Sequence, residues 1–173
     1  MLFIFDLDGT VVDSSHRQGA GTLAEWRELN TPENISLDSE LPYADVMRDA
    51  IQRDRNSVWV CTSRIMGDAD FDWLSKRALM PSTIIHRTIK EDNIPAGEFK
   101  ARALLRHAQK IGWTWARLSD NAIMFDDDRD VIDTLRSFDV RVVNATRYND
   151  YIIQRLSLIH ISEPTRQEAI SYA

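Results

Sequence analysis

The sequence is poor in cysteine, has no long apolar run and carries no excess of positive charge. Cys61 is the single cysteine among 173 residues, which excludes an internal disulfide and fits a reducing cytoplasm. We expect no membrane partner and no signal peptide, because no apolar run reaches the ~20 residues of a transmembrane helix and the apolar N-terminus lacks a basic region. With a net charge of −6, the chain can contact nucleic acid only through a local basic patch.

What the sequence does contain is enough apolar material for one buried core. Hydrophobic residues make up 43% of the chain, which suits a single domain and is too little for two large ones. Apolar, β-rich runs alternate with segments of helical periodicity, and this alternation predicts a three-layer, Rossmann-like α/β domain with a central parallel sheet. We expect strands near residues 2–7, 57–61, 82–86, 121–125 and 139–144, and helices near 20–29, 42–54, 68–79, 96–111 and 129–138.

Two carboxylates follow the first apolar run. Residues 2–5 are all apolar, as in a strand buried on both faces, and the chain continues with Asp6, Asp8, Gly9 and Thr10. An unpaired buried charge is strongly unfavourable, so this strand end predicts a cation, and a divalent metal is the obvious one for carboxylate oxygens. The alternative is an acidic turn without function, since Asp-Gly is a common turn dipeptide.

A later apolar run, residues 121–125, ends in three consecutive carboxylates. Asp126, Asp127 and Asp128 follow it, and Asp130 comes shortly after. Like charges so close together raise each other's pKa unless a cation keeps them ionised, so this cluster predicts the other half of a metal site. Asp126 and Asp127 are the expected ligands, although the triple repeat leaves the register open by one residue and leaves Asp130 open as well. The alternative is a solvated acidic turn.

Two other polar residues stand at the ends of regular elements. Thr62 follows the apolar run 58–61, although many buried strands lead into a polar turn of this kind. Lys100 falls in the first turn of the helix expected at 96–111, where a positive charge opposes the helix macrodipole. Helix propensity therefore does not explain this lysine, and the alternative is an ordinary surface lysine.

Together these segments resemble the four motifs of the haloacid dehalogenase-like (HAD) phosphohydrolases, in the order of that family and over residues 1–146. The resemblance implies a magnesium-dependent phosphatase with Asp6 as the nucleophile and Asp8 as general acid and base. A dehalogenase would not need Asp8, so phosphatase chemistry is favoured. The other implied roles are metal ligation by Asp6, Asp8, Asp126 and Asp127, catalysis by Thr62 and Lys100 (with Arg87 or Lys90 as alternative cations), and substrate contact by Gly9 and Thr10.

The segments between the motifs are short. A large cap domain does not fit between the first and second motifs, or between the second and third, in addition to the core helices. We therefore expect little or no cap. Members of the resembled family that lack a cap leave the site open to macromolecules or close it by oligomerising. This favours a large substrate and leaves the oligomeric state open.

A closer similarity is to the 3′-phosphatase domains of phage polynucleotide kinase/phosphatases. It rests on Cys61–Arg64, Asp70–Leu74, Ile85–Arg87, Phe99–Lys100 and Phe125–Val131. The similarity implies removal of 3′-phosphates from DNA or RNA ends during repair, and Arg is suited to bidentate phosphate binding. The implied substrate contacts are Ser63, Arg64, His86 and Arg87. The sequence contains no kinase P-loop, Gly-x-x-x-x-Gly-Lys-Ser/Thr, so we expect no kinase activity from it.

Two other classes of function stay open. A 5′- or 3′-nucleotidase, or another small-molecule phosphatase, would use the same catalytic residues. A non-catalytic binding domain is disfavoured, because such relics usually lose an aspartate and here all are present.

The C-terminal segment resembles foreign sequence. Leu156–Arg166 is similar to the translation of a sequencing adapter, and Ile170–Ala173 is similar to the next part of the same primer. We therefore expect the phosphatase domain to span residues 1–155, and residues 156–173 to be read-through that is not native. On this interpretation the native gene can continue past Arg155. The alternative is a genuine amphipathic tail.

Overall fold

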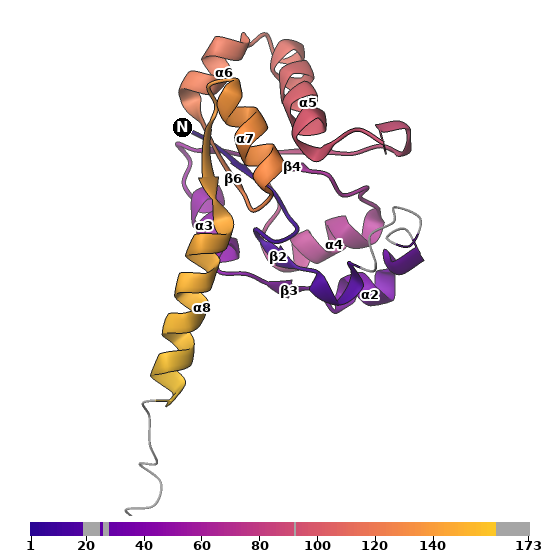
Figure 1. Ribbon diagram of the computed structural model, residues 1–173, viewed down its shortest axis with the longest axis vertical. Helices are drawn as coiled ribbons and strands as arrows, with labels where there is room; N and C mark the ends of the chain where they lie inside the picture. The colour runs from indigo at the N-terminus through magenta and orange to yellow at the C-terminus, as the bar shows by residue number, and fades with distance from the viewer. Residues whose placement is uncertain (19–24, 26–27, 92, 162–173) are drawn as a thin grey trace, which may run out of the picture.

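The structure, a computed structural model, describes residues 1–18, 25, 28–91 and 93–161, and its centre is a five-stranded parallel sheet (Figure 1). The strand order is β5-β4-β1-β6-β7, so that β1 lies in the middle and pairs with both β4 and β6. Each strand of this sheet lies within or beside its predicted range. The strands are β1 (Leu2–Phe5), β4 (Ser57–Thr62), β5 (Thr83–His86), β6 (Ala122–Asp126) and β7 (Arg141–Asn144).

The side chains of each central strand alternate between two separate cores. Phe3 and Phe5 point into one core and Leu2 and Ile4 into the other, because successive residues of a strand face opposite sides of the sheet. Helices therefore cover both faces, which confirms the three-layer α/β architecture. One face carries α3 (Tyr43–Gln52), α4 (Asp68–Lys76) and α8 (Ala145–Ile161), and the other carries α5 (Ala96–Lys110), α6 (Trp115–Asn121) and α7 (Arg129–Ser137).

Four of the predicted helices are present as α3, α4, α5 and α7. The helix predicted near residues 20–29 falls mostly outside the described residues. The sequence did not indicate α8, α6 or the short α2 (Pro32–Ser36). Helices α6 and α2 begin where Thr114 and Thr31 cap the first turn with their side chains. None of the described helices is long and apolar enough to cross a lipid bilayer.

The described residues add little over the carboxyl ends of the strands. Between β1 and β4 they form, besides the core helix α3, the 3-10 helix η1 (Ser15–Arg17), α2 and a two-stranded sheet of β2 (Val12–Asp13) and β3 (Ser39–Glu40). Between β4 and β5 the one helix is α4. The expectation of little or no cap is confirmed for the part of the chain that the structure describes.

Candidate active site

The carboxyl ends of three adjacent strands bring the predicted motifs together. Asp6 follows β1 directly, and its backbone N–H donates to the carbonyl of Phe125 in β6 at 3.0 Å. Thr62 is the last residue of β4 and Asp126 the last of β6. In open α/β sheets ligands bind at this edge.

Three carboxylates gather at this edge closely enough to hold a metal ion. One oxygen each from Asp6, Asp126 and Asp127 lies within 4.8 Å of the other two. The pKa of Asp6 is raised to about 7, mainly by burial, with a smaller upward contribution from the charge of Asp126 and an opposing one from Lys100. Burial and the charge of Asp6 raise the pKa of Asp127 to about 6. Crowded carboxylates of this kind favour a bound cation.

Lys100 already supplies one positive charge to the cluster. Its ammonium nitrogen lies 2.7 Å from Asp126 Oδ2 and 2.9 Å from Asp6 Oδ1, and the side chain is almost completely buried. Burial alone would lower the pKa of Lys100, but Asp6 and Asp126 raise it above the ordinary value. The lysine is therefore charged, and the alternative that it is a surface residue is wrong.

Asp8 faces a different set of partners. Its carboxylate accepts hydrogen bonds from Arg64 Nε at 3.0 Å, Arg64 Nη2 at 2.5 Å and the Ser14 hydroxyl at 2.5 Å. Burial would raise the pKa of Asp8, yet Arg64 and Ser14 outweigh burial and lower it. The Asp8 carboxylate is thus ionised and lies outside the group of three that can hold a metal.

Arg64 is part of a buried network of charges. Besides Asp8, it donates to Asp70 at 2.7 Å and to Asp38 at 3.4 Å. Asp38 in turn accepts two hydrogen bonds from Arg17, at 2.7 and 2.6 Å, and both of these side chains are almost completely buried. Sequence reasoning missed Asp38 and Arg17, because neither belongs to a motif. The substrate contact predicted for Arg64 stays a prediction.

The turn after Asp8 packs against the other acidic segment. The Thr10 hydroxyl donates to Asp127 Oδ1 at 3.4 Å. Gly9 has φ +72°, which disfavours other L residues, and a Cβ atom there would lie 2.2 Å from Asp127 Oδ2. The turn therefore holds Asp127 in place, and the predicted substrate contacts of Gly9 and Thr10 stay predictions.

The last residue of β4 and the residue after it offer hydroxyl groups. Thr62 is almost completely buried, and its Oγ1 accepts from the backbone N–H of Arg64 at 3.2 Å. The Ser63 hydroxyl is buried and has no hydrogen-bond partner among the described residues. A buried hydroxyl without a partner is unfavourable, so Ser63 is available to a bound ligand.

His86 and Arg87 lie one strand further out. His86 pairs in register with Thr62, and its Nδ1 lies 3.1 Å from the carbonyl oxygen of Arg87. The Arg87 guanidinium donates to the carbonyls of Ile94 at 2.8 Å and Glu91 at 3.2 Å. These bonds support the loop after β5, and the substrate contacts predicted for His86 and Arg87 stay predictions.

The other carboxylates near the triple repeat have structural partners. Asp128 caps α7 by accepting from the Asp130 N–H at 2.7 Å, and Asp130 Oδ2 accepts from the Gly97 N–H at 3.0 Å. Asp130 therefore links α7 to the start of α5. Of the registers that the sequence left open, Asp126 and Asp127 are the pair that lies in the group with Asp6, and metal ligation by them stays a prediction.

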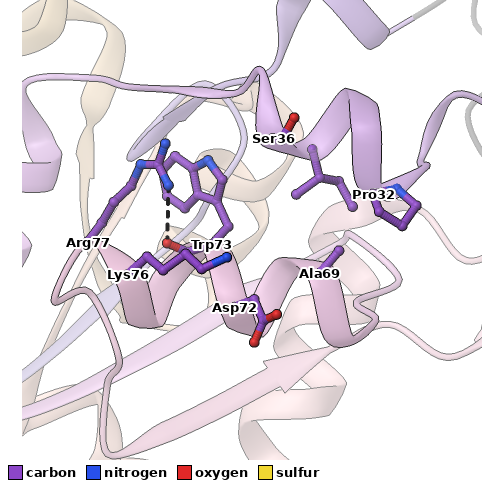
Figure 2. A pocket seen from close by; sticks show the side chains of 8 residues that line it. Pro32, Ser36, Ala69, Asp72, Trp73, Lys76 and Arg77 are labelled. Carbon is purple, nitrogen blue, oxygen red and sulfur yellow. Dashed lines mark hydrogen bonds between the residues drawn. The ribbon is translucent and has the colours of Figure 1, made fainter.

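A separate pocket of about 310 Å³ lies between α2 and α4 (Figure 2). Arg77 lies over the Trp73 ring, 4.0 Å from its centroid, and donates to the Trp73 carbonyl at 3.5 Å. The pocket contains none of the carboxylates described above, so it is distinct from the acidic site. Its lining residues are Pro32, Ile35, Ser36, Ala69, Asp72, Trp73, Lys76 and Arg77.

Solved structures share this fold. A HAD-like hydrolase from Streptococcus pneumoniae superimposes with a TM-score of 0.60 at 13% identity over 83% of each chain. One chain of the Pnkp1/Rnl/Hen1 RNA repair complex matches with a TM-score of 0.59 at 19% identity. The match covers 83% of the present chain and 41% of that chain of the complex. A HAD family enzyme of Bacteroides thetaiotaomicron, solved with magnesium and inorganic phosphate, matches with a TM-score of 0.50 at 11% identity, over 83% of this chain and 92% of the other.

Comparison of sequences gives a more specific result. The 5′-deoxynucleotidase of Escherichia phage T5 is 24% identical over 178 aligned positions, which cover 91% of this chain and 72% of the phage protein. The sequence profile described as bacteriophage T5 5′-deoxynucleotidase matches residues 1–170. With the HAD fold and the site above, these matches identify a phosphatase, a hydrolase of phosphoric monoesters. The chain belongs to the bacteriophage T5 5′-deoxynucleotidase family.

Proposed function

We propose that this phosphatase hydrolyses deoxynucleoside 5′-monophosphates with Mg²⁺ and an aspartyl-phosphate intermediate on Asp6. The observation that carries the proposal is the position of Asp6, which contacts Lys100 and lies beside the carboxylates of Asp126 and Asp127 at the carboxyl ends of the strands. The choice of a 5′-deoxynucleotide rests on the family match over residues 1–170.

The donor set fits Mg²⁺. Asp6, Asp126 and Asp127 offer only oxygen atoms, within 4.8 Å of one another, and Mg²⁺ prefers such ligands together with substrate phosphate. A structural relative was solved with magnesium and phosphate, which supports the same choice. When bound, Mg²⁺ would supply positive charge that offsets the repulsion between the carboxylates and the phosphate. The further ligand that we propose, the Asp8 backbone carbonyl, follows from the resemblance.

In the first proposed step a carboxylate oxygen of Asp6 attacks the phosphorus. The bond from phosphorus to the ester oxygen breaks, and the leaving oxygen takes a proton from Asp8. Lys100, 2.9 Å from Asp6, neutralises charge on the phosphoryl oxygens, and the hydroxyls of Thr62 and Ser63 donate to them.

In the second step Asp8 accepts a proton from water. The water oxygen attacks the phosphorus, the bond to Asp6 breaks, and phosphate leaves. The contacts of Asp8 with Arg64 and Ser14 stabilise the ionised form that this step needs. The first step needs protonated Asp8, so the proposal requires the Asp8–Arg64 contact to weaken when substrate binds.

The 3′-phosphatase activity in DNA or RNA repair stays a second prediction. It rests on the sequence similarity at Cys61–Arg64 and Ile85–Arg87. Arg64 and Arg87 bind groups of the protein itself in the structure, so their contacts add no support for a nucleic-acid end. We also keep the cytoplasm as the predicted location.

The test is phosphate release by the purified full chain with Mg²⁺. The substrates are a deoxynucleoside 5′-monophosphate, the corresponding deoxynucleoside 3′-monophosphate, the corresponding ribonucleoside 5′-monophosphate and a 3′-phosphorylated oligonucleotide. We expect the highest kcat/KM with the 5′-deoxynucleotide, whereas a clear preference for the oligonucleotide would replace this proposal with end repair. Asp6→Asn should abolish turnover of every substrate, and the control Asp133→Asn, an exposed residue of α7, should retain it.

A further inference from the structure

A buried asparagine of the last helix contacts the turn that follows the catalytic aspartates. Asn149 lies in α8 and is only 4% exposed. Its Nδ2 donates to the carbonyl of Thr10 at 3.0 Å and to that of Gly9 at 3.3 Å. Its Oδ1 accepts from the backbone N–H of Tyr43, the first residue of α3, at 3.1 Å.

These three bonds use both hydrogen-bonding groups of one side chain. An asparagine side chain has one amide group with two N–H donors and one carbonyl acceptor, and all three contacts here are to backbone. The Tyr43 N–H is one of the helix-initial donors that lack a partner within the helix, and Pro42 before it provides no side-chain cap. Asn149 therefore joins α3, α8 and the turn after Asp8 at a single point.

The N–H groups of the turn are bonded within the turn itself. The N–H groups of Thr10, Val11 and Val12 all donate to the Leu7 carbonyl, at 2.8 to 3.2 Å. The carbonyls of Gly9 and Thr10 receive the Asn149 amide from the opposite side. Because Thr10 is fully buried, loss of that amide would leave its carbonyl without a hydrogen-bond partner among the described residues, which is unfavourable in the protein interior.

The same turn determines the position of two reacting segments. Gly9 lies directly against Asp127, the Thr10 hydroxyl bonds to Asp127, and Asp8 immediately precedes both residues. A small displacement of the turn would therefore move the acid–base carboxylate and a metal ligand together. Misplacement of catalytic groups by about 1 Å can reduce a rate by about 10²-fold.

We propose that Asn149 is a positioning residue that holds the turn Asp8–Thr10 in its catalytic geometry from helix α8. The inference rests on the proposed roles of Asp6 and Asp8. It is independent of which phosphomonoester is the natural substrate.

The matched control for this proposal is the neighbouring Tyr148. Its ring packs on Tyr43, with centroids 4.6 Å apart, and Tyr43 packs on Phe125 at 5.1 Å. Tyr148 thus helps to dock α8 on the same helix α3, but through an aromatic contact rather than a bond to the turn. Tyr148→Ala weakens the docking of the helix, whereas Asn149→Ala also removes the bonds to the turn.

The experiment measures kcat and KM of the full chain with p-nitrophenyl phosphate and Mg²⁺, together with Tm. For Asn149→Ala we expect kcat to fall at least about tenfold while KM stays within about twofold, since the lost interaction acts on the transition state. Tyr148→Ala should lower Tm and keep kcat within about twofold of the wild type. A folded Asn149→Ala with wild-type kcat would overturn the proposal, as would an equal loss of kcat in Tyr148→Ala.

Hydrogen exchange provides a second measurement that does not depend on activity. Asn149→Asp keeps the size of the side chain and an acceptor for Tyr43 but loses both donors to the turn. The amides of Thr10 to Val12 should exchange faster in Asn149→Asp than in Tyr148→Ala, and equal rates would contradict the proposal. If Asp6→Asn remains active, the assignment of Asp6 as the nucleophile is wrong. The exchange rates would still show whether Asn149 holds the turn.

Discussion

Gly9 and Asp127 approach each other so closely that a Cβ atom on Gly9 would lie 2.2 Å from Asp127 Oδ2. Gly9 also has φ +72°, a conformation that costs other L residues about 1–2 kcal/mol. Gly9→Ala should therefore combine backbone strain with a collision at Asp127, a proposed metal ligand. We expect kcat to fall by at least about 10²-fold, as steady-state kinetics with p-nitrophenyl phosphate will show.

Gly112 provides the control for this substitution. It has φ +75°, but a Cβ atom there would meet nothing within 4 Å. Gly112→Ala should reproduce the loss of stability from backbone strain and leave kcat within about twofold of the wild type. A similar loss of kcat in both variants would show that strain alone, and not the contact with Asp127, explains the effect.

Lys100 is the cation that contacts both Asp6 and Asp126. Lys100→Met keeps much of the side-chain volume but removes the charge that would neutralise the phosphoryl group. We expect kcat to fall by about 10²–10³-fold, the range found when a transition-state donor is removed. Lys110→Met at the exposed end of the same helix is the control, and a Lys100→Met enzyme as active as that control would exclude the proposed role.

The sequence predicted the strand ends of the candidate site because their chemistry is local. Asp6 and Asp126 follow apolar runs directly. Carboxylates at the end of a buried strand require a partner whatever the rest of the tertiary structure is. Asp38 and Asn149 carry no such signal, because their partners lie 21 or more positions away in the sequence and only the tertiary fold brings them together. The likeness of Arg64 to a substrate-binding residue also gave no indication that Asp8, Asp70 and Asp38 surround it.

Asp38 joins two buried arginines. It accepts two hydrogen bonds from Arg17 and lies 3.4 Å from Arg64 Nη2. Asp38→Asn leaves both guanidinium groups without this negative charge, and breaking a buried ion pair destabilises a protein by about 3–5 kcal/mol. We expect a loss of this size in the free energy of unfolding, measured by urea denaturation. Asp45→Asn, which removes an exposed partner of Arg48, should change the free energy little, and equal effects would contradict the argument.

The contacts of helix α8 predict where the chain can be shortened. Asn149 and Tyr148 contact the body of the protein, and both precede Arg155. A protein of residues 1–155 should therefore keep kcat/KM within about twofold of the full chain, as expected if residues 156–173 are not native. A protein of residues 1–144 should lose activity. Inactivity of the 1–155 protein would show that the segment after Arg155 contributes to the fold.

Binding of Mg²⁺ should depend steeply on pH. Burial raises the pKa of Asp6 to about 7 and that of Asp127 to about 6, from an ordinary value of 3.8, so protons compete with the metal below those values. A raised pKa in the folded state also means that, without metal, these two groups make the protein less stable as the pH rises from about 4 to about 7. Mg²⁺ binds the ionised carboxylates, so its stabilising effect should grow over the same range.

The measurement is the increase in Tm caused by saturating Mg²⁺, with calorimetric affinities at the same pH values. We expect a clearly larger increase and tighter binding at about pH 7.5 than at about pH 5.5, because the carboxylates must lose protons to bind the ion. Asp127→Asn removes one of the three carboxylates and should reduce the increase at both pH values, whereas Asp133→Asn should behave as the wild type. An affinity that stays constant between these pH values would mean that Asp6 and Asp127 are not the ligands.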